Sequence, residues 1–290
     1  MTDIESDEII ERWLAHNFRP DRHYGAFLTG STACGASQKG SDVDVVFLTR
    51  ADAIVDSDSS YHLSYFGGML FSFTETTQEE ALSFCTDPEK AVKYYVRGLQ
   101  EAQILRDSNR GALERIQKAA QGFYWSDALA AKADERALFH LAGCAEEAQK
   151  LTRYLTPAKG RETSTLYLSL LALAINLPIA IALQQRLLCT GEYNLFEQVY
   201  GVMGADSLWS RAHRICLGDV SFLSELELPA VLTSKSRART GLKLYMETAR
   251  ALAPLVEGEE FNLVHAETRK FNAVIEETMR QLEMLGRKPE

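Results

Sequence analysis

The pattern of apolar positions along the chain changes character once, near residue 125. Before that point short alternating runs stand among helical ones, whereas afterwards every long segment has its apolar residues at helical spacing. The first part therefore predicts strands and helices together, and the second part helices alone. We expect an α+β chain, with a domain of a small mixed sheet and helices over residues 1–125 and an all-α helical domain over residues 126–290.

The first part contains several segments whose period can be read. We predict a helix over IESDEIIERWLAHNF and short strands over YGAFLT and DVDVVFLT. Two further alternating runs, YHLSYF and MLFSFTE, are joined by Gly67-Gly68, which is typical of a hairpin. The segment PEKAVKYYVRGLQEAQIL predicts a helix with Pro88 at its start.

The second part is helical in period throughout. The predicted helices are ADERALFHLAGCAEEAQKLTRYL, STLYLSLLALAINL, ARTGLKLYMETARALAPL and the tail FNLVHAETRKFNAVIEETMRQLEML. The longest apolar stretch, LYLSLLALAINLPIAIALQQRLL, has Asn176 and Pro178 near its middle and glutamines after it. These residues favour a buried, kinked helix over a membrane span.

Composition and charge narrow the class of protein. The 290 residues are 46% hydrophobic and carry a net charge of −9, with one basic cluster formed by Lys235, Arg237, Arg239 and Lys243. Because phosphate-backbone binding needs clustered cations, we do not expect nucleic acid as a substrate. Five scattered cysteines without a CxxC pair argue against a disulfide framework and a zinc site. With an acidic start that lacks the layout of a signal peptide, they favour a cytoplasmic location.

Candidate chemistry gathers in residues 30–48, GSTACGASQKGSDVDVVFL. A strand that ends at Gly30-Ser31 and turns into a short helix presents free backbone N–H groups to an anion such as a phosphate. On the next strand Asp42 and Asp44 are two apart and point to the same face. Two carboxylates beside a phosphate repel each other unless a cation lies between them, and Mg²⁺ prefers oxygen ligands of this kind. The segment therefore predicts metal-assisted phosphoryl or nucleotidyl transfer.

The same segment resembles the signature of the DNA polymerase β-like nucleotidyltransferase superfamily, in which Gly-Ser, a spacer and Asp-x-Asp follow one another. It is most similar to the small bacterial branch, which includes minimal nucleotidyltransferases and aminoglycoside-modifying enzymes with a helical C-terminal domain. The segment ILRDSNRGALERIQKAA adds a weaker resemblance. The resemblance implies a metal pair of Mg²⁺ ions on Asp42 and Asp44, and an NTP, expected to be ATP, whose triphosphate lies on Gly30 and Ser31.

Residues elsewhere in the motif and beyond it complete the candidate site. Lys39 and Ser41 lie in the spacer and are candidates for phosphate contacts, although the favoured interpretation of Lys39 is a solvent-exposed turn lysine. The family usually has a third carboxylate on a nearby strand, where this chain has Ser72. Glu75 is the nearest acid but has the opposite parity unless a bulge intervenes. The base is therefore absent, moved to Glu75, or supplied by the helical half, where Glu146 and the adjacent Glu147 are candidates.

The hypothesis drawn from these residues is an enzyme, a Mg²⁺-dependent nucleotidyltransferase. It would move a nucleoside monophosphate to a hydroxyl of a small molecule, such as an aminoglycoside, or of a partner protein. A non-catalytic module that binds nucleotide is the alternative, because Ser72 replaces a carboxylate. The sequence leaves the acceptor, the preferred base of the NTP and the oligomeric state open.

Overall fold

The computed structural model describes residues 3–38, 40–50, 61–109, 111–155, 163–219 and 233–256, and a few residues between 270 and 280. The chain divides into two compact units. The first consists of Met1–Ser126 and a short return segment, Leu188–Glu192. The second consists of Asp127–Leu187 and Tyr193–Glu290. The single boundary expected between residues 125 and 126 leaves out the return segment.

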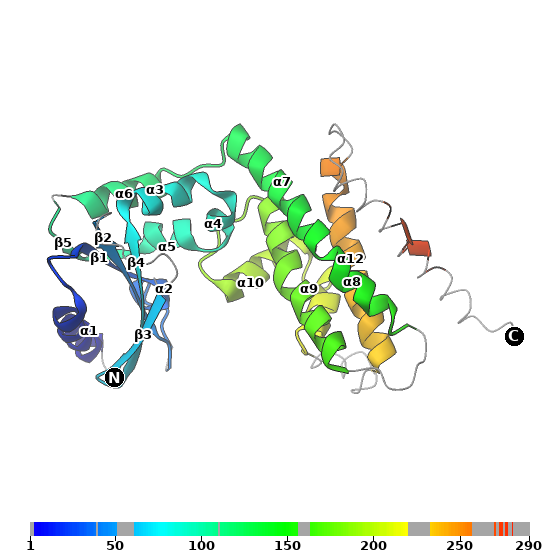
Figure 1. Ribbon diagram of the computed structural model, residues 1–290, viewed down its shortest axis with the longest axis horizontal. Coiled ribbons are helices and arrows are strands. Elements are labelled where there is room, and N and C mark those ends of the chain that lie inside the picture. Colours follow the sequence, from blue (N-terminus) through cyan, green and yellow to red (C-terminus); the bar gives the residue numbers. More distant parts are fainter. Residues whose placement is uncertain are drawn as a thin grey trace, which may run out of the picture. The chain divides into compact units, whose positions relative to one another are not determined.

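A five-stranded mixed sheet forms the centre of the first unit, with strand order β3-β4-β2-β1-β5 (Figure 1). The β2 and β4 strands are parallel, and the other neighbours are antiparallel. The elements in chain order are α1 (Asp3–Asn17), β1 (His23–Thr29), α2 (Gly30–Ala33), β2 (Val43–Thr49), β3 (Tyr61–Phe66), β4 (Met69–Thr77), α3 (Gln78–Ser83), the 3₁₀ helix η2 (Phe84–Thr86), α4 (Pro88–Val92), α5 (Tyr95–Glu101), β5 (Gln103–Asp107) and α6 (Ala112–Gln121).

One face of this sheet packs against α1. The indole of Trp13 is fully buried and stacks on Phe71, with 4.4 Å between ring centroids, and on Phe47. Alternate residues of β2, Val43 and Val45, belong to the same cluster. Because side chains alternate across a strand, the residues between them, including Asp44, face the other side of the sheet.

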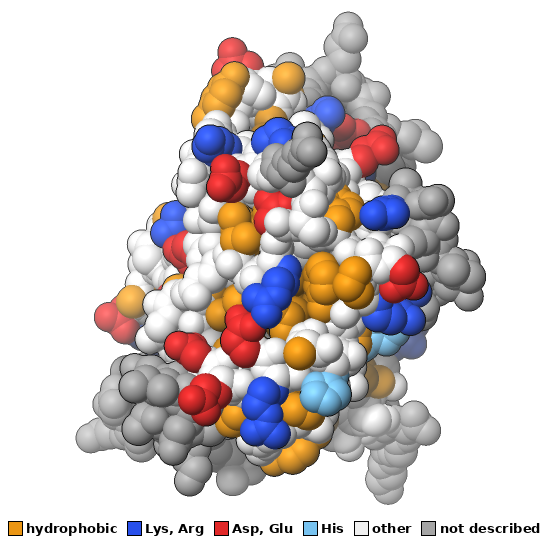
Figure 2. All heavy atoms as spheres, turned by 90° about the vertical axis from the view of Figure 1, so that its left-hand side faces the viewer, with side chains coloured by type: hydrophobic (Ala, Val, Ile, Leu, Met, Phe, Trp, Pro, Cys, Tyr) orange, Lys and Arg blue, Asp and Glu red, His pale blue; other side chains and the backbone are white. Residues whose placement is uncertain are grey.

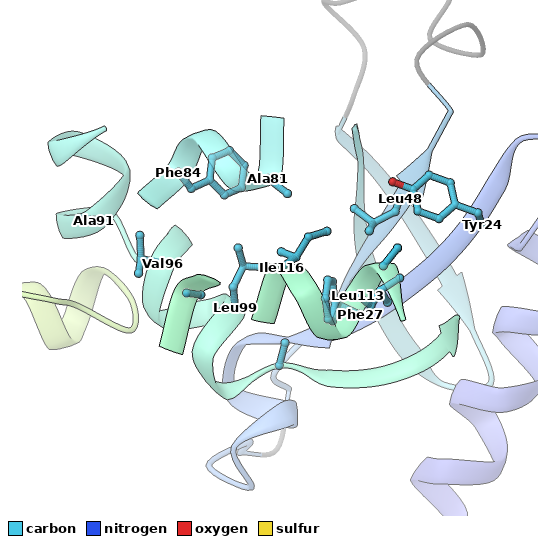
Figure 3. Close-up of a cluster of buried hydrophobic side chains, with 13 residues drawn as sticks. Tyr24, Phe27, Leu48, Ala81, Phe84, Ala91, Val96, Leu99, Leu113 and Ile116 are labelled. Carbon is cyan, nitrogen blue, oxygen red and sulfur yellow. The ribbon is translucent and has the colours of Figure 1, made fainter. Parts of the chain in front are cut away.

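The other face of the sheet packs against the helices that follow β4. Leu113 and Ile116 of α6 lie against Phe27 of β1 and Leu48 of β2 (Figure 3). Gly25 of β1 lets Leu113 approach closely, since a Cβ there would lie 2.1 Å from the Leu113 Cδ1 atom. The helices α3 to α6 thus cover the face of the sheet to which Asp44 points. Their contacts with that face include β1 and β5.

The second unit is all helical within its described residues. Its helices are α7 (Asp127–Gly143), α8 (Ala145–Thr152), α9 (Thr163–Gln184), α10 (Glu192–Met203), α11 (Leu208–Cys216) and α12 (Ser234–Val256) (Figure 1). The α9 helix is long and apolar enough to cross a membrane, but 67% of its apolar window is buried inside the protein. It is the core helix of the unit, in contact with α7, α8, α11 and α12.

The predicted α+β class, a small mixed sheet followed by a helical region, is confirmed. The helix predicted from Pro88 is wrong in its extent, because the chain breaks at Tyr94, which has a φ of +64°, and its last residues form β5. The single helix predicted over residues 133–155 is two helices, which meet at Cys144. The helix predicted over residues 261–285 lies almost wholly outside the described residues.

Candidate functional site

The Gly-Ser turn and the aspartate motif meet at one end of the sheet. Thr29, the last residue of β1, pairs with Asp44 on β2, so the turn that follows Thr29 passes beside the Asp44 side chain. Gly30 has a φ of +69°, and a Cβ added to it would lie only 2.2 Å from Oδ2 of Asp44. Only glycine gives both this backbone conformation and this close approach. The structure thus brings together two parts of the motif that the sequence separates.

Asp44 is a half-buried carboxylate without a cationic partner among the described residues. Burial raises the pKa of Asp44, the hydrogen bond that Ser72 Oγ donates to Oδ1 lowers it, and the nearby charge of Asp42 raises it. The net effect is a pKa above the ordinary value of an aspartate. A cation bound here would relieve both the lost hydration and the repulsion.

The loop between the turn and β2 is held by local hydrogen bonds. Thr32 Oγ1 donates to the backbone oxygen of Asp42 over 3.2 Å, which ties α2 to the residue that precedes β2. Ser41 closes a turn with Gln38: its Oγ accepts the Gln38 N–H over 2.9 Å, and its own N–H donates to the Gln38 carbonyl. The hydroxyl of Ser31, at the start of α2, has no hydrogen-bond partner among the described residues. Lys39 lies outside the described residues.

Glu75 lies apart from Asp44. Within the β2–β4 register, Asp44 pairs with Ser72, whereas Glu75 pairs with Phe47 and faces the opposite side of the sheet without a bulge. Its carboxylate forms an ion pair with Arg22 and accepts a hydrogen bond from Nε2 of His23 over 3.0 Å. His23 Nδ1 accepts the N–H of Arg19, so Nε2 carries the proton. These contacts give Glu75 a structural role at the start of β1.

Glu146 belongs to the second unit. Its side chain, on α8, is 74% exposed and forms an ion pair with Lys150 over 3.0 Å. The adjacent Glu147 is more enclosed, since it accepts hydrogen bonds from Ser169 Oγ over 2.6 Å and from Lys150 Nζ. Burial would raise the pKa of Glu147, but these two donors lower it.

The donor set around Asp44 suits a magnesium ion that is shared with a substrate. Within the described part of the chain, no group of three or more His, Cys, Asp or Glu side chains converges on one point. Mg²⁺ is bound in many proteins by only one or two carboxylates, with water and substrate phosphates as its other ligands. Asp42 and Asp44 are the two carboxylates that could serve such an ion beside the Gly30 turn.

A hollow lies at the opposite end of β2 from Asp44. It has a volume of about 290 Å³ and is lined by Tyr24, Thr49, Arg50, Thr77, Gln78, Glu79, Ser108 and Asn109. Thr49 ends β2, five residues beyond Asp44, so roughly 17 Å of strand separates the hollow from the aspartate. The hollow and the motif are therefore separate places, and of the two only the motif contains clustered carboxylates without cationic partners among the described residues.

Three contributors to the site were not identified as such from the sequence. Ser72 was recognised as a substitution for a carboxylate, but its hydrogen bond to Asp44 depends on the parallel pairing of β2 with β4. The backbone contacts from Thr29 and Thr32 depend likewise on the β1–β2 pairing and on the fold of the loop. The sequence signal for the two threonines is that Thr29 and Thr32, both with hydroxyl groups, directly flank Gly30-Ser31.

Of the comparisons with known proteins, only the one with solved structures finds a similarity. No protein-family model matches the chain, and no curated protein matches it. Among solved structures, a nucleotidyltransferase-like protein from Exiguobacterium sibiricum aligns with 97% of this chain and 89% of its own, at 12% identity and a TM-score of 0.41. At these values the two chains are similar only in outline.

Proposed function

We propose that this protein is a Mg²⁺-dependent nucleotidyltransferase that moves a nucleoside monophosphate, with ATP as the expected donor, to a hydroxyl group. The observation that carries the proposal is the contact of Gly30 with the Asp44 carboxylate. A residue with no side chain, in a left-handed turn, lies against a half-buried acid that has no cationic partner among the described residues. An anion on the turn and a cation on the acid would each stabilise the other there.

Each residue around the turn has a part in this proposal. The N–H groups of the Gly30-Ser31 turn and the Ser31 hydroxyl bind the triphosphate, together with Lys39 and Ser41 of the spacer. Asp42 and Asp44 hold the metal, and Ser72 fixes the orientation of Asp44 through its hydrogen bond. Mg²⁺, when bound, neutralises charge on the triphosphate and on the leaving pyrophosphate.

The acceptor hydroxyl must also lose its proton. Because Glu75 is held by Arg22 and His23 on the opposite face of the sheet, we assign the base to the helical unit, with Glu146 as the candidate. General-base help is worth about 10²–10⁴ in rate. A Glu146→Gln enzyme is therefore expected to keep its affinity for ATP and to lose about that factor in turnover.

The net charge and its distribution bear on the class of acceptor. The net charge is −9, and on the face shown in Figure 2 the coloured Lys and Arg side chains are interspersed with Asp and Glu. This favours a small-molecule or protein acceptor in the cytoplasm over nucleic acid.

The experiment that tests the proposal measures ATP binding by calorimetry with and without MgCl₂. The Asp44→Asn protein is expected to lose the Mg²⁺-dependent part of ATP affinity, because the amide keeps the Ser72 hydrogen bond but carries no charge. Asp21→Asn, at an exposed position before β1, is the matched control and should bind ATP as the wild type does. Equal Mg²⁺-dependent affinity in all three proteins would exclude the site.

A second candidate function is supported by Ser72. A hydroxyl stands where a third carboxylate would face Asp44, which suits a protein that binds a nucleotide without transferring it. Release of pyrophosphate from ATP in the presence of acceptors distinguishes the two. Mg²⁺-dependent ATP binding without any pyrophosphate release would favour the binding module.

A further inference from the structure

An apolar stripe lies on the exposed side of the edge strand β3. The side chains of β3 alternate, and those of Tyr61, Leu63 and Tyr65 are 60%, 59% and 75% exposed. Leu70 of β4, which pairs with Tyr65, is 40% exposed and extends the stripe. Four large apolar side chains that share one face of a hairpin are unusual in water unless something binds them.

The stripe lies on the same face of the sheet as the candidate site. Residues that pair directly across strands point to the same face. Leu63 pairs with Ser72, and Ser72 pairs with Asp44, so these three residues form one row across β3, β4 and β2. The hydrogen bond from Ser72 to Asp44 confirms that their side chains point the same way.

The opposite side of β3 is held in place by α1. The Trp13 indole N–H donates to Ser64 Oγ over 3.3 Å, and the rings of His16 and Phe66 lie 5.6 Å apart. His62 stacks on Phe73 of β4, with 4.9 Å between ring centroids. These contacts hold the inner side of β3 against α1 and β4, so its other side is the one that is exposed.

The chemistry of the stripe is apolar and uncharged. No residue of β3 or of its partner run Met69–Thr74 carries a carboxylate or a basic group other than His62, which faces the opposite side. A polycationic ligand would need acidic side chains here, and a phosphate would need cations. The tyrosine rings instead offer flat apolar contact with the hydroxyls as polar edges, and the leucines add aliphatic contact beside them.

The geometry of group transfer assigns an occupant to the stripe; this step rests on the proposed function. In an in-line displacement the attacking and leaving oxygens lie on opposite sides of phosphorus. The triphosphate is assigned to the Gly30-Ser31 turn, on the β1 side of Asp44, so the attacking hydroxyl comes from the β4 and β3 side. We propose that the stripe of Tyr61, Leu63, Tyr65 and Leu70 binds the acceptor, and that the acceptor is an uncharged molecule with a flat aromatic body and a hydroxyl.

The reaction implied by this placement is balanced without a further reagent. The acceptor oxygen forms a bond to the α-phosphorus, and the bond from that phosphorus to the bridging oxygen breaks. Pyrophosphate leaves with the electron pair, and the hydroxyl proton passes to a base or to solvent. Two strand spacings, about 10 Å, separate Leu63 from Asp44, which is a distance that a bicyclic phenol spans.

The test uses the full chain and 2-naphthol as the probe. Calorimetry measures binding of 2-naphthol and, separately, of Mg²⁺-ATP to wild type, Tyr65→Ser and Leu63→Ser. Tyr124→Ser is the matched control, because Tyr124 is 74% exposed, much like Tyr65, but lies outside the sheet. We expect the two stripe variants to weaken 2-naphthol about 5- to 50-fold and to leave ATP affinity unchanged. The control should bind both as wild type does.

Several results would overturn the assignment. The assignment is wrong if the wild type does not bind 2-naphthol, and it is also wrong if all four proteins bind 2-naphthol equally. A loss of ATP affinity in the stripe variants would make the stripe a nucleobase site instead. A wild-type dimer that Tyr65→Ser converts to monomer would make it an interface between copies.

Failure of the proposed function gives a different result. Mg²⁺-ATP binding would then be the same in wild type and Asp44→Asn, whatever 2-naphthol does. Transfer of AMP to 2-naphthol that disappears in Tyr65→Ser, while pyrophosphate release to water persists, would support both proposals together. Transfer that is insensitive to Tyr65→Ser and Leu63→Ser would overturn the acceptor assignment alone.

Discussion

Two acids of one sheet show how environment separates a ligand-binding carboxylate from a structural one. Asp44 loses hydration without a cationic partner among the described residues, so burial raises its pKa. Burial would also raise the pKa of Glu75, but hydrogen bonds from His23 and Arg22 and the charge of Arg22 outweigh it and lower that pKa. A perturbed acid with no built-in partner is the one that suits a metal or substrate.

Removal of the Glu75 charge is predicted to affect stability and not nucleotide binding. Glu75→Gln would leave Arg22 and His23 without their anion, at a cost of about 2 kcal/mol in the free energy of unfolding. Because the pKa of Glu75 is lowered, this contribution is present above its ordinary pKa and is lost as the pH falls through the folded value. Urea unfolding at pH 7 measures it, with the exposed Glu8→Gln as control. If Glu75→Gln lost Mg²⁺-ATP affinity while Glu8→Gln kept it, the structural role of Glu75 would be contradicted.

His213 predicts a pH dependence in the helical unit. Its ring is fully buried, Nε2 donates to the Ala174 carbonyl over 2.8 Å, and Nδ1 accepts the Tyr200 hydroxyl over 2.7 Å. Burial lowers the pKa of His213 to about 4. Below pH 6.5 His213 binds a proton in the unfolded chain but stays neutral in the folded protein. The free energy of unfolding therefore falls as the pH drops from 6.5 towards 4.

The size of that loss is roughly 3 kcal/mol, at 1.36 kcal/mol for each pH unit between the two pKa values. Urea unfolding of the full chain, followed across this pH range, measures it. The His213→Gln protein should be less stable at pH 7 but should have a flatter profile between pH 6.5 and 4. A His213→Gln profile as steep as that of wild type would refute the assignment.

At the level of single residues, the motif allowed Gly30 and Asp44 to be singled out because Gly-Ser and Asp-x-Asp have a chemical meaning at that spacing. The ion pair of Glu75 with Arg22 and its hydrogen bond from His23 were not predictable, because these residues meet Glu75 only through the register of three strands. Sequence parity did predict that Glu75 and Ser72 face opposite sides. It could not say what Glu75 would contact there.

Elements were predictable where their period was long and unmixed. The hairpin around Gly67-Gly68 and the buried helix α9 formed as expected. The edge strand β5 was missed because its residues are mostly exposed and follow a helical run without a proline or glycine between them. The break at Tyr94 depends on a left-handed residue that is not a glycine, which no local pattern indicated.

Two helical glycines predict opposite effects of the same substitution. Gly241 lies in α12, where a Cβ would be 2.5 Å from Leu151 Cδ1 and 2.6 Å from Leu170 Cδ2, both in buried side chains. Gly201 lies in α10 with nothing within 4 Å of its Cβ position. Gly201→Ala should stabilise the helical unit by about 0.5–1 kcal/mol through helix propensity.

Gly241→Ala should instead destabilise the unit, by about 1–2 kcal/mol, because overpacking exceeds the gain in propensity. Thermal unfolding of both variants and of wild type measures the difference. If both variants were equally stabilised, the close packing of α12 on α8 and α9 at Gly241 would be refuted.

At the scale of the whole molecule, the first unit is discontinuous in sequence. After the helices up to α9, the chain returns to it with Leu188–Glu192. Leu188 packs against the core cluster of that unit, and Cys189 is fully buried. A change of hydrophobic period marks where the helical half begins, but it carries no signal for a short return segment, because such a segment has no period.

The return segment predicts that a fragment of residues 1–126 is less stable than the same unit within the full chain. Loss of the Leu188 contact alone should cost about 1–2 kcal/mol. Hydrogen exchange of the buried β2 amides measures the stability of the unit in both settings. In the full chain, Leu188→Ala should speed their exchange, whereas Leu208→Ala, at a 48% exposed position of α11, should not. Equal protection in the fragment and the full chain would show that the first unit is complete at residue 126. An inactive fragment would then point to a catalytic group in the helical half, since loss of fold could no longer explain it.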